Sequence, residues 1–375
     1  MLIALFFTYN YSLKTWSDSG ILLKELEIYE MLNRKHGIKF KFITYGYKDE
    51  ESYIKKFDFI EIIPIYEYVS KSKFKLINYI KSFLIPFKIK SLLADVTLLK
   101  QHQLLGSWVS ILSKFINKKP LIIRTGYDMF LFSIYEKKSM RIKFLYYFLT
   151  LLSLRFANLY TIASTSDSNK LRKYFKYSKV KIRRNWIKEV KNIKNLNKRH
   201  SDRVLSVGRL EKQKNYSYLI DSLSNSKYSI DIVGRGSLKE PLKKESGEKN
   251  VNLKLLDPID NESLLEVYQD YKYFILTSFY EGNPKALIEA MSSGCIVLAS
   301  NIENNSEIID NYINGILVGE GLDSISDALG WLDENPDKAS QISTNAINFI
   351  NENYLLSDLV EKEYKDYKNL TRNIN

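Results

Sequence analysis

FILTSFYEGNPKALIEAMSSGCIVLAS, residues 274–300, has the pattern of a strand, a loop, a helix and a second strand. The apolar run that opens it is typical of a buried strand. We expect Asn283 to cap the helix and Pro284 to be its first residue, because a proline there loses no hydrogen bond. Gly294 is expected to end the helix in the left-handed conformation, and Cys295–Ala299 to form the next buried strand.

Two glutamates stand out within this segment. Glu281 follows the first strand directly, and Glu289 lies in a helix that is otherwise almost wholly apolar. Burying a carboxylate among apolar side chains is costly unless something hydrogen-bonds it. The pattern alone leaves two interpretations open: a pair of ligand-binding carboxylates, or ordinary acids on the surface or in a salt bridge to a neighbouring lysine.

The two glutamates, with seven residues between them that include Gly-Asn-Pro, resemble the signature of the retaining GT-B glycosyltransferases of family 4. The resemblance implies that Glu281 lies against the donor sugar and that Glu289 binds the nucleotide ribose. It also implies that the intervening loop meets the sugar and the diphosphate, through Gly282, Asn283, Lys285 and Ala286. A helix N-terminus suits this role, since it offers unpaired N–H groups and partial positive charge.

Further motifs extend the resemblance over most of residues 200–320, and more loosely over the N-terminal half. The strand Arg203–Val207 leads into GRLEKQKN, residues 208–215, which matches the family's phosphate loop. Arg209 and Lys214 would there clamp the donor diphosphate, and two cations make a metal unnecessary. The family reads the nucleotide base through backbone groups near the residue that matches Ile259.

The first half of the chain alternates strands with helices, which favours a doubly wound parallel sheet. Expected strands in the whole chain, besides those above, are Leu2–Phe7, Lys39–Thr44, Phe59–Pro64, Ala94–Leu99, Pro120–Arg124, Asn158–Ser164, Ser229–Val233, Asn252–Leu256 and Gly315–Val318. A short helix is expected at Ser306–Asp310. The expected organisation is therefore two Rossmann-like domains facing a cleft, in the GT-B manner. The domains are residues 1–187 and 203–352, with a linker at 188–202 and a C-terminal helix, 353–375, crossing back to the first domain.

Two candidate residues of the first domain follow its strands. The resemblance places His102 facing the reacting sugar, where a neutral imidazole accepts a proton or holds a sugar hydroxyl. Arg124 would line the cleft beside it and bind an acceptor phosphate. The alternatives are an ordinary loop histidine, and an Arg124–Asp128 pair that serves structure alone.

Charge is distributed unevenly along the 375 residues. Residues 1–185 hold 33 Lys and Arg against 14 Asp and Glu, whereas residues 186–375 hold 23 against 29. This asymmetry predicts an anionic partner for the first half. No recognition-helix, zinc or base-stacking pattern indicates nucleic acid. One cysteine, Cys295, excludes a disulfide within the chain, and the N-terminus lacks the pattern of a signal peptide, so we expect a cytoplasmic protein.

Two basic and apolar segments indicate a membrane surface. Residues 71–90 interleave lysines with Phe, Ile, Leu and Tyr, and residues 140–156 follow Lys137 and Lys138. Such segments lie in the headgroup plane of anionic bilayers. The alternatives are a solvated helix for the first segment and, for the second, a helix that mostly covers the sheet.

The sequence thus predicts a metal-independent glycosyltransferase without a cofactor, which takes a UDP- or GDP-linked sugar. Its acceptor would be a lipid-linked or other saccharide in O-antigen, capsule or lipopolysaccharide assembly, at the inner face of the plasma membrane. The alternatives are a soluble acceptor, with the charge serving only solubility, and a non-catalytic GT-B scaffold that binds a nucleotide sugar or a partner enzyme. A sugar-nucleotide epimerase is less favoured, since none of its acid/base residues is recognisable.

Overall fold

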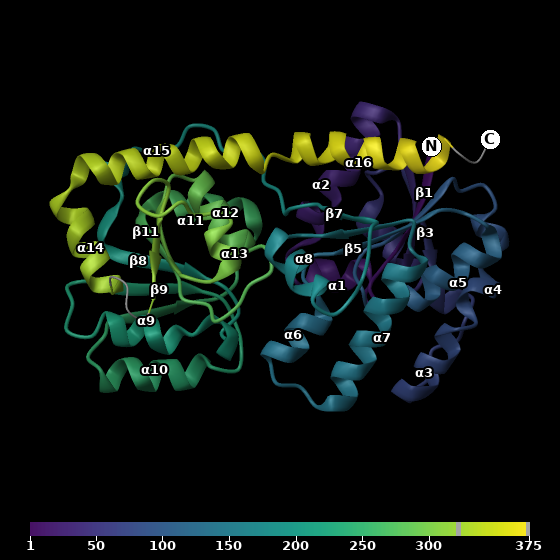
Figure 1. Ribbon diagram of the computed structural model, residues 1–375, viewed down its shortest axis with the longest axis horizontal. Coiled ribbons are helices and arrows are strands. Elements are labelled where there is room, and N and C mark those ends of the chain that lie inside the picture. The colour runs from purple at the N-terminus through teal and green to yellow at the C-terminus, as the bar shows by residue number, and fades with distance from the viewer. Residues whose placement is uncertain (320–323, 373–375) are drawn as a thin grey trace. The chain divides into compact units, whose positions relative to one another are not determined.

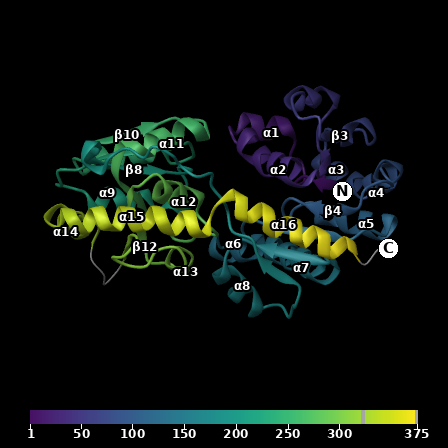
Figure 2. The ribbon, with the colours of Figure 1, turned by 90° about the horizontal axis from the view of Figure 1, so that it is seen from above.

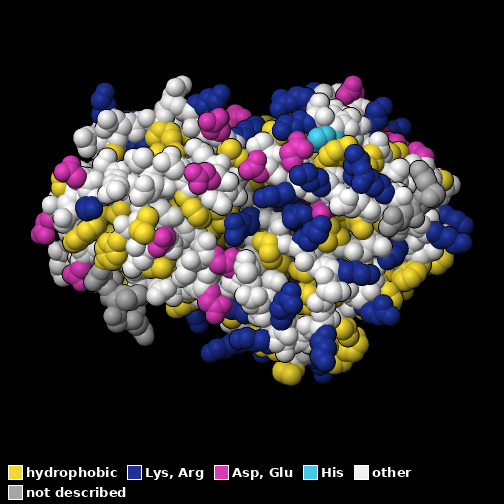
Figure 3. Space-filling model, turned by 45° about the horizontal axis from the view of Figure 1, so that its top comes forward, with side chains coloured by type: hydrophobic (Ala, Val, Ile, Leu, Met, Phe, Trp, Pro, Cys, Tyr) yellow, Lys and Arg dark blue, Asp and Glu magenta, His cyan; other side chains and the backbone are white. Residues whose placement is uncertain are grey.

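The computed structural model describes residues 1–319 and 324–372, which form two compact units (Figure 1). The first unit is Met1–Arg184 together with the chain from Ser357 onward, and the second is Asn185–Leu356. Lys and Arg side chains gather over the first unit on the face drawn in Figure 3. This matches the excess of cations in the first half of the sequence.

A seven-stranded parallel sheet forms the centre of the first unit, with the order β3-β2-β1-β4-β5-β6-β7. The strand order reverses between β1 and β4, which is where open sheets of this class bind ligands. The strands are β1 (Leu2–Phe6), β2 (Lys39–Thr44), β3 (Ile60–Pro64), β4 (Leu98–Gln101), β5 (Leu121–Thr125), β6 (Leu159–Ile162) and β7 (Val180–Ile182).

Helices cover both faces of this sheet. They are α1 (Leu13–Asp18), α2 (Leu22–His36), α3 (Lys75–Ser82), α4 (Ile85–Lys88), α5 (Ser107–Asn117), α6 (Met129–Tyr135), α7 (Met140–Phe156), α8 (Thr165–Arg172) and α16 (Leu356–Thr371). Figure 2, a view from above, shows α16 lying across the first unit. In the described parts of the chain, no helix is both long and apolar enough to cross a bilayer.

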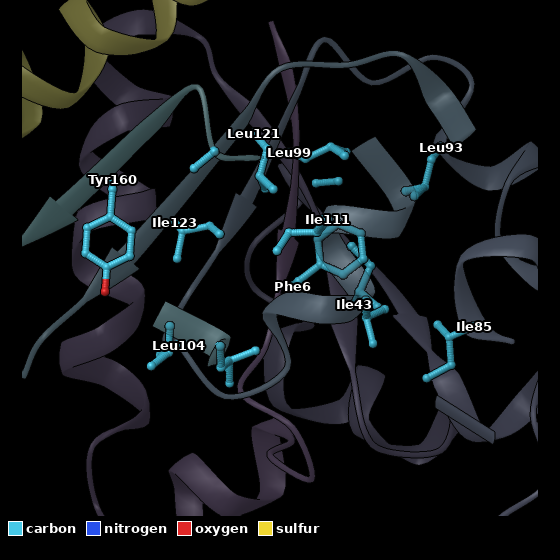
Figure 4. Close-up of a cluster of buried hydrophobic side chains, with 14 of the residues drawn as sticks. Phe6, Ile43, Ile85, Leu93, Leu99, Leu104, Ile111, Leu121, Ile123 and Tyr160 are labelled. Carbon is cyan, nitrogen blue, oxygen red and sulfur yellow. The ribbon is translucent and has the colours of Figure 1, made fainter. Parts of the chain in front are cut away.

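Alternating residues of the strands build the core of the first unit (Figure 4). Phe6, Leu99 and Ile123 point to one face of the sheet, where they meet Ile85 of α4 and Ile111 of α5. The next residue along β4, Lys100, points to the other face and reaches α16. The period of two in a strand therefore separates an apolar layer from a layer that contains a buried cation.

The second unit repeats this plan with six parallel strands in the order β10-β9-β8-β11-β12-β13. Its strands are β8 (His200–Val207), β9 (Ser229–Val233), β10 (Leu253–Leu256), β11 (Tyr271–Leu276), β12 (Ile296–Ser300) and β13 (Ile316–Val318). Its helices are α9 (Tyr216–Ser222), α10 (Lys239–Glu248), α11 (Asn261–Asp270), α12 (Lys285–Ser292), α13 (Glu303–Ser306), α14 (Ile325–Glu334) and α15 (Pro336–Asn353). Separate apolar clusters fill the two faces of the sheet.

The expectation of two doubly wound parallel sheets is confirmed, with a few local corrections. β4 begins at Leu98 instead of Ala94, because a 3-10 turn at Ser91–Leu93 delays the strand. The helix expected at Ser306–Asp310 is wrong, since α13 ends at Ser306. Gly294 does follow α12 with a φ of 78°, in the left-handed region that favours glycine.

Candidate functional site

Two loops meet where the strand order of the second sheet reverses, at the carboxyl ends of β8 and β11. Three hydrogen bonds join them. The Phe279 N–H donates to the Gln213 carbonyl, Gln213 Nε2 to the Tyr280 carbonyl and Thr277 Oγ1 to the Lys214 carbonyl, each at 2.9 Å. The loop of Arg209 and Lys214 and the loop of Glu281 are therefore one structure.

An ion pair lies at the centre of these loops. Lys214 Nζ is 2.5 Å from Glu281 Oε1, and Ser278 Oγ donates to the same oxygen at 2.6 Å. The exposed fractions of the two charged side chains are 12% and 8%. Glu281 is therefore no surface acid. It forms a salt bridge to a lysine, as one of the two interpretations expected, and this lysine is Lys214, the residue predicted to bind phosphate.

Arg209 and Gly208 complete the first loop. Arg209 is exposed, and its Nη2 donates to Gln213 Oε1 at 3.1 Å. Gly208 leaves space for the lysine, because a Cβ there would lie 2.9 Å from Lys214 Cε. Gly234 allows an even closer approach of two backbones, since its Cβ would lie 1.9 Å from the Gly208 carbonyl oxygen. These glycines keep the loop against the neighbouring turn after β9.

Buried amide side chains hold the loop between Glu281 and α12. Asn304 Nδ2 donates to the Gly282 carbonyl at 2.6 Å. The Asn185 N–H donates to Asn283 Oδ1 at 2.8 Å, and Asn185 Nδ2 to the Asn283 carbonyl at 2.5 Å. The prediction that Asn283 caps α12 is thus wrong. Pro284 occupies the cap position, and α12 has no side-chain cap hydrogen bond in the described chain.

The first turn of α12 includes Lys285 and Ala286, and the side chain of its cap residue, Pro284, offers no hydrogen-bond acceptor to the N–H groups at the start of the helix. Both residues are half-buried. An uncapped helix N-terminus carries partial positive charge, which suits an anionic group.

Glu289 lies on α12 and is buried. Asn261 Nδ2 donates to its Oε1 at 3.1 Å, and the Tyr268 hydroxyl to its Oε2 at 3.4 Å. Burial, reinforced by the charge of Glu289, raises the pKa of Tyr268, so this phenol stays protonated and donates. Ile259 is exposed in the loop after β10, two residues before Asn261.

Sequence reasoning missed the residues that hold these groups in place. Gln213, Ser278, Tyr268 and Asn304 each hydrogen-bond a predicted site residue or its loop. Tyr268 and Asn304 lie 21 and 22 residues from the residues that they bond, so no local pattern could have identified them. Ser278 did carry a signal, since it stands two residues after a buried strand, where polar residues face the binding edge of a parallel sheet.

His102 follows β4 in the first unit and is buried beside Trp16. Its Nε2 lies 3.3 Å from Glu25 Oε2. Burial lowers the pKa of His102 although Glu25 opposes the shift, and the charges of Arg124 and Lys100 lower it further. The imidazole is therefore neutral at pH 7.

Arg124 lies on β5, close enough for its charge to act on His102. The alternative of a structural pair with Asp128 is wrong. Asp128 Oδ1 accepts the Leu131 N–H at 2.9 Å and caps α6, and Asp128 Oδ2 accepts the Tyr160 hydroxyl at 3.4 Å. Within the described residues the Arg124 guanidinium has no hydrogen-bond or salt-bridge partner.

Comparison with known proteins finds a matching family, and the match lies within the second unit. Residues 188–349 match the family described as glycosyl transferases group 1. This match covers most of the second unit. The matched residues include the Lys214–Glu281 pair, Arg209, Glu289 and the first turn of α12.

Sequence relatives occur among proteins of surface polysaccharide assembly. The capsular polysaccharide biosynthesis glycosyltransferase CapH of Staphylococcus aureus is 33% identical over 131 residues, 32% of this chain and 36% of the relative. The O-antigen biosynthesis glycosyltransferase WbnH of Escherichia coli is 32% identical over 160 residues, 42% of this chain and 46% of the relative. Each alignment thus spans less than half of the relative's own length.

Solved structures resemble the whole chain. The Anabaena protein Alr3699/HepE in complex with UDP has a TM-score of 0.76 at 14% identity, covering 98% of this chain and 100% of its own. TarM has a TM-score of 0.76 at 14% identity and covers 99% of both chains. The fold of both units is accordingly that of the GT-B glycosyltransferases.

Proposed function

We propose that the protein is a glycosyltransferase that moves a sugar from a nucleotide-sugar donor to a hydroxyl acceptor and retains the anomeric configuration. The observation that carries the proposal is the buried Lys214–Glu281 contact, which lies four residues before the first turn of α12. A cation, a carboxylate and helix N–H groups at one sheet edge suit a ligand with both a diphosphate and a sugar. The match to the group 1 family supports this conclusion.

The proposed donor is a UDP- or GDP-linked sugar, bound without a metal or a cofactor. One Escherichia coli relative is a UDP-Gal:alpha-D-GlcNAc-diphosphoundecaprenol alpha-1,3-galactosyltransferase, 32% identical over 144 residues. The similar Anabaena structure contains UDP. Arg209 and Lys214 supply the positive charge in this proposal. The ammonium group of Lys214 has three N–H groups; one donates to Glu281, and the other two can donate to phosphate oxygens.

In the proposed reaction the bond between the sugar C1 and the diphosphate oxygen breaks, and a bond between C1 and the acceptor oxygen forms. The acceptor hydroxyl attacks from the face of the leaving group, and its proton passes to the diphosphate oxygen. Arg209, Lys214 and the N–H groups of 282–286 stabilise the charge that develops on that oxygen. Glu289 accepts hydrogen bonds from the ribose hydroxyls, and Glu281 positions the sugar.

We assign the acceptor side to the first unit. A neutral His102, oriented by Glu25, holds a sugar hydroxyl, and Arg124 binds an acceptor phosphate. The acceptor is a lipid-linked or other saccharide of surface polysaccharide assembly, as the names of the relatives suggest. Residues 71–90 bring the enzyme to an anionic membrane surface at the cytoplasmic side.

The decisive test is release of nucleoside diphosphate by the purified full chain with a panel of UDP- and GDP-sugars. We expect Glu281→Gln to lower turnover at least ~100-fold, as for loss of one transition-state contact. The matched control is Glu334→Gln at the exposed end of α14, which should leave turnover unchanged. Near-normal turnover of Glu281→Gln would contradict the mechanism. Binding of a donor without any release would favour the scaffold alternative.

A further inference from the structure

Helix α7 packs one side on the core, through Leu149 and the partly buried Tyr147 and Leu154, and exposes many apolar residues on its other side. Its buried residues are Leu149, Thr150 and Ser153, and Ser153 Oγ hydrogen-bonds Ser107 Oγ of α5 at 3.0 Å. Phe144 is 64% exposed. The exposed apolar residues of α7 are Met140, Ile142, Phe144, Leu145, Phe148, Leu151 and Leu152. One side of this helix covers the core, as the alternative had it, and the other side exposes these apolar residues where a helix that faces water would carry polar ones.

Helices α3 and α4 expose a second apolar surface. Leu76 and Ile80, one turn apart on α3, are 71% and 60% exposed. The exposed apolar residues of this segment are Phe74, Leu76, Ile77, Ile80, Phe83, Leu84 and Phe87. Single exposed apolar side chains are ordinary, but clusters of this kind mark an interaction surface.

The two surfaces belong to the same layer of the first unit. α4 packs against α5, and α5 packs against α7. Figure 1 shows α3 and α7 on the side of the unit that lies away from α16. Phe115 of α5, which is also exposed, lies in the same layer. Both surfaces therefore belong to helices that pack on the same core cluster.

Cations surround these surfaces, and acids are absent from their sequences. Residues 68–94 and 137–166 contain no Asp or Glu. The exposed cations are Lys71, Lys73, Lys75, Lys88, Lys90, Lys137, Lys138 and Arg141. A second copy of the chain would bring like charges together at this surface, whereas an anionic bilayer matches both the charge and the apolar side chains.

We infer that α3, α4 and α7 together insert their exposed apolar side chains into the headgroup region of an anionic lipid bilayer. The surface deepens the proposed function, on which it rests, because a lipid-linked acceptor would be available there. It joins the two segments that the sequence indicated separately, 71–90 and 140–156, into one contact surface. Two separated contacts fix how the first unit is oriented on the bilayer, which a single amphipathic helix does not.

Sedimentation of the full chain with vesicles tests the inference. The variants are Phe144→Ser/Phe148→Ser for α7 and Leu76→Ser/Ile80→Ser for α3. A matched control, Leu23→Ser/Ile313→Ser, replaces two apolar residues that are 56% and 51% exposed elsewhere. We expect each test variant to bind vesicles of phosphatidylglycerol and phosphatidylcholine roughly 100-fold more weakly, about tenfold per side chain. The control should bind like the wild type.

Several results would overturn the inference. Unchanged binding of the α7 variant would remove α7 from the surface, and equal binding to pure phosphatidylcholine would exclude an anionic partner. A concentration-dependent increase in mass in solution that the same variants abolish would identify a second copy as the occupant. Nucleoside diphosphate release without vesicles is measured in parallel. Its absence in the wild type would contradict the proposed function and leave the bilayer result standing, because the two assays use different residues.

Discussion

At the scale of single residues, the Lys214–Glu281 pair affects both stability and the proposed chemistry. Both side chains are largely removed from water, and their charged atoms are 2.5 Å apart. Removing one member of such a pair leaves an uncompensated charge, which costs about 3–5 kcal/mol, whereas replacing both with neutral groups costs little. Stability and turnover can therefore be separated by mutation.

We predict that Lys214→Met lowers the free energy of unfolding by about 3 kcal/mol and lowers turnover at least ~100-fold. The double variant Lys214→Met/Glu281→Gln should regain most of the stability, since no charge is left buried, but none of the turnover. Urea unfolding and nucleoside diphosphate release measure the two effects. Recovery of turnover in the double variant would show that the pair serves structure alone.

Asp128 should make the stability of the folded protein depend on pH, in a direction that its pKa shift determines. Burial raises its pKa to about 6, although hydrogen bonds from backbone N–H groups oppose the shift. In the unfolded chain an Asp has a pKa of about 3.9, so the folded protein binds the proton more tightly. This contribution to stability is complete below pH ~4 and is lost as the pH rises through about 6.

Asp128→Asn should therefore weaken the pH dependence of stability. The amide keeps an oxygen for the Leu131 N–H and never ionises. Between pH 5 and 7.5 we expect the loss of unfolding free energy to shrink by about 1.4 kcal/mol, which corresponds to about one pKa unit. Urea unfolding at the two pH values measures it. An unchanged dependence would mean that the folded-state pKa of Asp128 is ordinary.

At the scale of elements, the turns after β8 and β9 depend on glycine for their close approach. The Leu210 N–H donates to the Arg235 carbonyl at 2.9 Å, and the Gly208 N–H to the Val233 carbonyl at 3.0 Å. A Cβ at Gly234 would lie 1.9 Å from a backbone oxygen, which cannot move without breaking this contact. The position of the loop that contains Arg209 and Lys214 is thus set by its neighbour.

We predict that Gly234→Ala lowers the free energy of unfolding by about 3 kcal/mol or more, and weakens donor binding. Gly330→Ala is the control, because a Cβ there meets nothing within 4 Å and the residue lies inside α14. That change should raise stability by about 0.5–1 kcal/mol. Thermal unfolding with and without UDP measures both. A tolerated Gly234→Ala would show that the two turns can move apart.

The elements also show how much the sequence could predict. β2 and β9 have the predicted bounds to the residue, because apolar runs between turn residues depend only on local pattern. The role of Asn283 could not be predicted, since its partner Asn185 is 98 residues away. The sequence could not predict which side of α7 is buried either. Its apolar residues are numerous enough to fit either face, and only the packing of Ser153 on α5 decides which face is buried.

At the scale of the whole molecule, the last helix of the sequence belongs to the first unit. Lys100 Nζ of β4 lies 2.5 Å from Glu363 Oε2 and 2.7 Å from the Tyr367 hydroxyl. Burial alone would raise the pKa of Glu363, but the ammonium of Lys100 outweighs it and the pKa is lowered. Asp366 adds contacts to Lys181 and Arg183. The first unit therefore gains its last helix, α16, only after the chain has passed through the second unit.

Because each unit has its own apolar core, we predict two transitions in scanning calorimetry that respond to different changes. Glu363→Ala leaves Lys100 buried without its counterion and should destabilise the first unit by about 3–5 kcal/mol, while Lys100→Met/Glu363→Leu should restore most of it. UDP at about one hundred times its dissociation constant should stabilise the second unit by about 2.7 kcal/mol. If UDP raised the transition that Glu363→Ala lowers, the donor would bind the first unit, and the assignment of the group 1 domain as the nucleotide-binding part would be wrong.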